Sequence, residues 1–172
     1  MNVSHKLILK IIFLFLGLYF VLMWVYNFFL SQSTPDVFTL LTAKQVNLLY
    51  HRTGFDTFYA ALENPAEIGI KWGEHWLVKV VEGCNGISVI IVFLSFIWAF
   101  PAGFSDKLKF SFFGVMIIWL MNIVRIYILG LIYHYYPQWF DVSHRVFFPA
   151  SIYGMVILLW IIWIRKLIRS RV

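Results

Sequence analysis

Three residues that lie far apart in the sequence carry the side chains that cysteine-based catalysis needs. Cys84 is the only cysteine of the chain, and a thiolate is a strong nucleophile. Arg125 lies inside an apolar run and supplies a permanent cation, and His144 can exchange a proton near neutral pH. A nucleophile, a cation and a proton carrier together suit attack on a carbonyl group. We therefore take these three residues as candidate catalytic residues.

Three neighbours are candidate supporting residues, and two of them have more than one interpretation. Asn122 precedes Arg125 by three positions and shares its helix face. Glu82 could orient His144, pair with Arg125 or mark the water interface, although a carboxylate too close to a thiol makes that thiol harder to ionise. Gly86 could admit a substrate backbone beside the cysteine or let helices pack closely.

The composition indicates a membrane protein. Of 172 residues, 62% are hydrophobic and 20% are aromatic, far above the content of a soluble domain. The apolar runs are long and unbroken, which favours helices over a barrel, and those long enough to span a bilayer fall at about 7–30, 77–100, 110–133 and 146–164. The first has no small-residue cleavage site, so we expect an uncleaved helix rather than a signal peptide. The predicted fold is an all-α, polytopic membrane protein, with four transmembrane helices in a single membrane domain over 1–172.

Basic residues cluster on one side of this predicted bundle. They are Lys6, Lys10, Lys107, Lys109, Arg165, Lys166, Arg169 and Arg171. The positive-inside rule predicts that this side is cytoplasmic and that both termini lie there, in the cytoplasmic (inner) membrane. Segment 31–76, whose basic residues are balanced by acidic ones, is then an extracytoplasmic loop. We interpret the basic residues behind the net charge of +6 as anchors that fix the membrane topology, rather than as a nucleic-acid-binding surface. No nucleic acid partner is therefore expected.

The predicted extracytoplasmic loop contains a weaker pattern of its own. Phe38, Leu41, Val46 and Leu49 recur at roughly helical spacing, which predicts an amphipathic helix on the bilayer surface. Proline and glycine within 63–73 give a weak signal for a turn or a pair of strands.

This orientation brings the three candidate catalytic residues to the same side of the membrane. Cys84 and Arg125 fall in the outer halves of successive predicted helices, and His144 lies at the outer mouth of the last one. An arginine inside the bilayer costs at least about 2.5 kcal/mol on insertion scales, so Arg125 should face protein or water. Taken singly, the residues also fit a packing cysteine, a snorkelling or ion-paired arginine and an interfacial histidine. Their shared side and similar depth favour one joint site.

Three short motifs then suggest a family. The sequence "EGCNGIS" contains Glu82, Cys84 and Gly86, "NIVR" runs from Asn122 to Arg125, and His144 precedes the last span. In this order they resemble the Cys, Arg and His motifs of the exosortase/archaeosortase family, over about 78–153. Many relatives have more spans, so the chain resembles a short form of that family.

The resemblance implies a membrane-embedded cysteine protease or transpeptidase. Such an enzyme cleaves and sorts proteins that carry a C-terminal sorting signal, at the extracytoplasmic face. By resemblance, Cys84 is the nucleophile, Arg125 the cation of the site and His144 the acid and base. The expected partners are a membrane protein substrate with a C-terminal transmembrane sorting signal and the lipid bilayer. Neither the substrate, the acceptor nor the oligomeric state is indicated.

Two other interpretations compete with the enzyme at this point, and the first of them stays open. A non-enzymatic membrane scaffold or assembly factor would use the same polar residues to hold helices together. A metal or redox site could combine the cysteine with His51, His75, His134 or His144. No pair among them has a diagnostic ligand spacing, and Arg125 would repel a cation, so we expect no metal and no cofactor.

Overall fold

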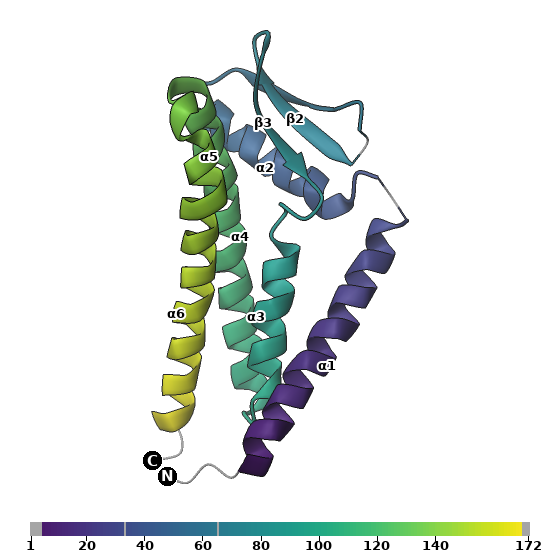
Figure 1. Ribbon diagram of the computed structural model, residues 1–172, viewed down its shortest axis with the longest axis vertical. Coiled ribbons are helices and arrows are strands. Elements are labelled where there is room, and N and C mark those ends of the chain that lie inside the picture. The colour runs from purple at the N-terminus through teal and green to yellow at the C-terminus, as the bar shows by residue number, and fades with distance from the viewer. Residues whose placement is uncertain (1–4, 33, 65, 170–172) are drawn as a thin grey trace.

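The computed structural model describes residues 5–32, 34–64 and 66–169 of the chain. Long helices form a bundle, and a smaller layer of one helix and one sheet covers one end of it (Figure 1). The bundle helices are α1 (His5–Leu30), α3 (Ile87–Ala99), α4 (Phe104–Tyr135) and α6 (Phe148–Arg169). The covering layer consists of α2 (Val37–Arg52), β1 (Thr57–Ala61), β2 (Glu67–Trp72) and β3 (His75–Val81).

Three helical segments of the described chain are long and apolar enough to cross a membrane. They are His5–Leu30, Phe104–Tyr135 and Pro137–Arg169. The last one contains α6 and the short turns before it, which are η1 (Pro137–Trp139), α5 (Phe140–Val142) and η2 (Ser143–Phe147). The predicted membrane helices at 7–30, 110–133 and 146–164 are thus confirmed as apolar helices, and the chain is a multi-pass membrane protein.

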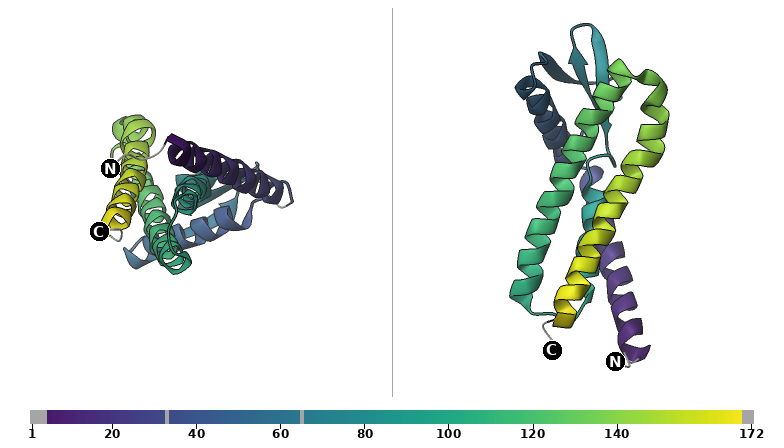
Figure 2. Two further views of the ribbon diagram at one scale, coloured as in Figure 1. Left: turned by 90° about the horizontal axis from the view of Figure 1, so that it is seen from below. Right: turned by 90° about the vertical axis from the view of Figure 1, so that its left-hand side faces the viewer.

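The predicted fourth span, 77–100, differs from the structure. Only Ile87–Ala99 is helical, and these 13 residues cover about 20 Å at 1.5 Å per residue, less than the roughly 30 Å hydrocarbon core. The short helix α3 packs against α1, α4 and α6, and Figure 2 shows it between them. It is therefore an inner helix of the bundle, and a bundle of four full spans is not what the structure shows.

The prediction of an all-α fold is wrong for the covering layer. Strands β1, β2 and β3 form an antiparallel sheet in that order. In the first part of the predicted span, "LVKVV", Val78 and Val80 are buried and Lys79 between them is exposed, and the β-branched valines favour a strand. A short apolar run of this kind cannot be told from a helix by hydrophobicity alone. The weak strand signal within 63–73 corresponds to β2 and the turn after it, where Gly73 has a φ of 56°.

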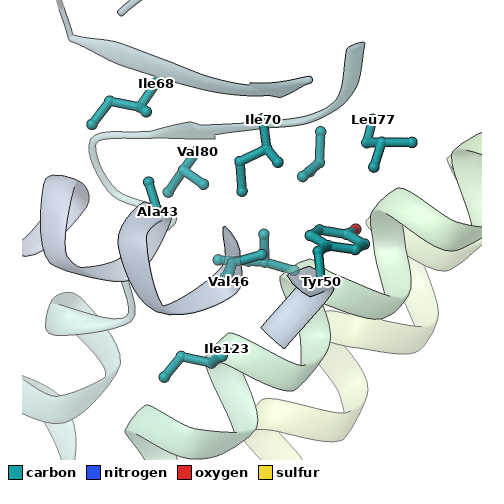
Figure 3. Close-up of a cluster of buried hydrophobic side chains, with 10 residues drawn as sticks. Ala43, Val46, Tyr50, Ile68, Ile70, Leu77, Val80 and Ile123 are labelled. Carbon is teal, nitrogen blue, oxygen red and sulfur yellow. The ribbon is translucent and has the colours of Figure 1, made fainter. Parts of the chain in front are cut away.

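The sheet and α2 share one hydrophobic core. Ile68, Ile70 and Val80 of the sheet face Val46 and Tyr50 of α2, as Figure 3 shows. The predicted amphipathic helix is confirmed as α2, but its buried face differs from the predicted one. Only Val46 among the four predicted apolar residues is fully buried. The sheet, and not a lipid surface, covers this face of the helix.

The N-terminal end of α1, the start of α4 and the end of α6 lie together at the end of the bundle away from the sheet (Figure 1). Lys166 of α6 binds Asp106 of α4 there at 2.8 Å. The basic residues of the positive-inside count that the structure describes belong to these helix ends, and Arg171 lies outside the described residues. That this end faces the cytoplasm stays a prediction.

Gly130 of α4 lies where the bundle meets the covering layer. A Cβ added there would meet the hydroxyl of Tyr50 and would lie 3.3 Å from the Cβ of Val78. Tyr50 is fully buried and donates a hydrogen bond of 2.7 Å to the carbonyl of Tyr127. Burial raises the pKa of this hydroxyl, so it stays protonated and remains a donor.

We expect Gly130→Ala to lower the stability of the protein. Overpacking costs about 1–3 kcal/mol, which exceeds the gain of up to about 1 kcal/mol from the better helix propensity of alanine. Thermal unfolding in detergent measures the effect. Gly17→Ala on α1 is the matched control, because no atom lies within 4 Å of a Cβ there. Equal melting temperatures for both variants would contradict the close packing at Gly130.

Candidate active site

Cys84 lies in the loop that joins β3 to α3. The prediction that it lies inside a membrane helix is therefore wrong. Its backbone N–H donates to the carbonyl of Val81 at 2.9 Å, which closes a tight turn. Gly83 has a φ of 90° at the third position of this turn, as a type II turn requires, and Gly86 has a φ of 82° just before the helix. These two left-handed residues interrupt the apolar run, which is why the helix starts only at Ile87.

Two predicted supporting residues hold this loop against α4. The side-chain amide of Asn122 donates a hydrogen bond of 3.0 Å to the carbonyl of Cys84. Gly86 packs on the same amide, and a Cβ at this position would lie 3.2 Å from Cγ of Asn122. Asn122 is 1% exposed, so this contact joins the cysteine loop to the buried side of α4.

Glu82 has a different contact from those considered in the sequence. Its carboxylate Oε1 accepts a hydrogen bond of 3.3 Å from the backbone N–H of Asp36, at the start of α2. Within the described part of the chain, Glu82 pairs neither with Arg125 nor with His144. The residue links the cysteine loop to the covering layer.

Asn85, next to the cysteine, is the centre of a buried polar network that the sequence did not reveal. Its amide donates to the hydroxyl of Tyr26 at 2.8 Å and to the hydroxyl of Thr39 at 3.2 Å. It also lies 3.4 Å from the buried carboxylate of Asp36, to which the Thr39 hydroxyl donates. Its side-chain carbonyl oxygen accepts at 3.1 Å from the N–H of Ile87, the first residue of α3, and so satisfies one of the free N–H groups at the start of that helix. The network thus ties the loop to both α1 and α2. The one sequence signal was a polar residue between two glycines.

We expect Asn85→Ala to destabilise the protein and to disturb the loop. The change leaves buried oxygens of the network without their donor, and an unsatisfied buried polar group costs about 1–3 kcal/mol. A lower melting temperature and an altered rate of Cys84 alkylation by iodoacetamide would show both effects. The rate is specific because the chain has no other cysteine. Asn64→Ala is the control, because Asn64 is exposed, and equal effects of the two variants would contradict the network.

Cys84 and His144 line the same cavity, although they come from different parts of the chain. The cavity has a volume of about 610 Å³ and lies between β3 on one side and α4 and α5 on the other. Its far wall includes Leu129, Tyr133 and Phe140. The structure thus brings the thiol and the imidazole to one cavity, although no hydrogen bond joins them in the described part of the chain.

His144 lies on η2, a π-helical turn before α6. Such turns are rare and occur frequently at functional sites. The ring stacks on Phe140 with 5.8 Å between ring centroids and 6° between planes. Within the described residues no group forms a hydrogen bond with its ring nitrogens, so both remain available to a substrate or to the thiol.

Arg125 lies beside this cavity rather than in its lining. It is on α4, three residues after Asn122, which holds the cysteine loop, and one turn before Leu129, which lines the cavity. Its Nε is buried and has no hydrogen-bond partner. Among the described residues no carboxylate pairs with this guanidinium, so a structural ion pair does not account for it.

The described residues contain no group of three His, Cys, Asp or Glu side chains that could hold a metal ion. The site consists of a thiol, an imidazole and a nearby unpaired guanidinium. Such a set can transfer an acyl group through the sulfur.

One comparison with known proteins identifies a family. A family model described as transmembrane exosortase matches residues 2–166. No curated protein matches the chain, and no solved structure matches it.

Proposed function

Because the chain belongs to the transmembrane exosortase family, we propose that it is a membrane-embedded cysteine protease or transpeptidase. Its substrate is a membrane protein that ends in a sorting signal with a transmembrane helix. The sheet and the cavity face the extracytoplasmic side of the cytoplasmic membrane, where the bond that is cleaved leaves the bilayer.

One observation carries this proposal. A nucleophile, Cys84, and a proton carrier, His144, line one cavity of about 610 Å³, and an unpaired arginine lies next to it. A cavity of roughly 300–1,000 Å³ is typical of ligand sites. If each of the three side chains had only a structural role, nothing would require them to lie in or next to one cavity.

The first step forms an acyl-enzyme. His144 takes the proton of the Cys84 thiol, and the thiolate attacks the carbonyl carbon of the scissile peptide bond. The carbonyl oxygen becomes an oxyanion, which the guanidinium of Arg125 stabilises. The carbon–nitrogen bond then breaks, His144 returns the proton to the leaving amine, and a thioester remains on Cys84.

The second step releases the product. An amine, a hydroxyl group or water attacks the thioester carbonyl while His144 accepts the proton of the attacking group. The carbon–sulfur bond breaks, and the thiol of Cys84 is restored. The thiol and the imidazole have no hydrogen bond to each other in the free protein, and such bonds often tighten only when substrate binds.

Trapping of the intermediate tests the proposal. The protein is co-expressed with a membrane protein that ends in a transmembrane helix and a basic tail, and both are analysed by mass spectrometry. We expect a cleaved product and an adduct on Cys84 that hydroxylamine removes. A cleaved product with the adduct on another residue would contradict the role of Cys84. Lack of both, with the tailed protein bound but intact, would favour the alternative of a non-enzymatic scaffold.

A further inference from the structure

We infer that the free edge of β3 binds the substrate as an added strand, in an extended conformation. The inference rests on the proposed function and concerns how the same site recognises a polypeptide. Within the described chain, β3 pairs with β2 alone, so the outer edge of β3 has no strand partner.

The cavity runs along this free edge. Val78 pairs with Ile70 and faces the core shared with α2, whereas the next residue, Lys79, points to the opposite face of the sheet. Both residues nevertheless line the cavity, and so does Val81 near the end of the strand. A cavity that is lined from both faces of one strand lies at its edge.

The edge leads directly to the nucleophile. β3 ends at Val81, and the turn that follows holds Cys84 through the hydrogen bond to the Val81 carbonyl. A chain that pairs with β3 therefore passes close to the thiol. The other free edge of the sheet, that of β1, has no such connection.

The chemistry of an unpaired strand edge selects the occupant. The backbone presents N–H and C=O groups at regular intervals, and leaving them unpaired away from water is costly. An extended polypeptide supplies the matching groups in the right order, as in other cases of strand addition. The opposite wall consists of Leu129, Tyr133 and Phe140. We therefore assign to this edge the substrate segment next to the scissile bond, with an apolar side chain at every second residue.

Lys79 does not compete with such a strand. Its ammonium binds the carboxylate of Glu67 on β2 at 2.9 Å, across the face of the sheet. The hydrogen bond from Lys79 lowers the pKa of this carboxyl, so the pair stays charged at neutral pH. The edge of β3 remains open.

Disulfide cross-linking tests the inference. Cys84→Ala removes the only cysteine, and Lys79→Cys then places a single thiol at the edge. Single cysteines are introduced at successive positions before the scissile bond of the tailed protein that the wild-type enzyme cleaves. We expect disulfides at every second position, because alternate residues of a strand face the same side. With Val81→Cys instead, the most reactive position should move by two residues, since Val81 and Lys79 lie on the same face.

Tyr59→Cys on β1 is the matched control, because it places a thiol on the opposite edge strand of the same sheet. Disulfides from Lys79→Cys and Val81→Cys that do not alternate, or that are no more frequent than from Tyr59→Cys, would overturn the inference. The proposed function would survive that result if the wild-type enzyme still forms the adduct on Cys84. Lack of the adduct in the wild type would overturn the proposed function and this inference with it.

Discussion

Replacing Cys84 with alanine is expected to lower the rate of substrate processing by roughly 10³-fold or more, because the variant has no nucleophile for acyl transfer. The chain has no second cysteine that could take over. The measurement is the amount of cleaved product over time, with the tailed membrane protein at equal expression. Cys84→Ser should also be nearly inactive, because a hydroxyl group is far harder to ionise than a thiol.

The fold should survive these changes, and this separates catalysis from packing. Cys84 is only partly buried, and its loop is held by its backbone carbonyl and by Asn85, which both variants keep. Expression level and melting temperature should therefore stay near those of the wild type. Normal processing by Cys84→Ala would make the cysteine a packing residue and would move the scaffold interpretation to first place.

Replacing Arg125 with methionine is expected to reduce processing by about 10²–10³-fold, the usual cost of losing one donor to an oxyanion. The stability of the protein should rise, although the rate falls. An unpaired cation in a membrane helix costs at least about 2.5 kcal/mol on insertion scales, and methionine removes that cost. We expect the stability to rise because Nε of Arg125 is buried and has no hydrogen-bond partner.

Arg125→Lys is the matched variant for charge. It keeps the cation but lacks the planar fork of the guanidinium, so we expect only partial recovery of the rate. Rates of processing and melting temperatures are measured for both variants. If Arg125→Met lowers stability strongly while the rate at equal folded protein is unchanged, then Arg125 serves the fold and the proposed oxyanion role is wrong.

Much of the helical part of the fold was predictable from the sequence. The three long apolar runs became α1, α4 and α6, because a backbone inside lipid must satisfy its own hydrogen bonds. Arg125 and Asn122 share one face of α4 as their spacing predicts. These features depend on local sequence and on the bilayer, so no knowledge of distant contacts is needed.

The segment from β3 to α3 shows where prediction from the sequence ended. Its apolar residues were taken for one membrane helix over 77–100, whereas the structure divides them between an edge strand, a loop and an inner helix. The choice depends on β2, which pairs with the strand in one sheet, and on Val46 of α2, which covers the strand from a segment distant in the sequence. Hydrophobicity says that these residues avoid water, but it does not say which partner covers them.

The sequence by itself determined the chemistry available to this protein, namely one thiol, one intramembrane guanidinium and a histidine before the last helix. It also determined the three long apolar helices and the family motifs that carry these residues. Only the tertiary structure decided that Cys84 lies on a loop, that it shares a cavity with His144, and that Asn85 anchors the loop to Tyr26 and Thr39. The physical reason is that a loop conformation and a cavity arise from hydrogen bonds and packing between distant segments, and local patterns contain no record of those pairings.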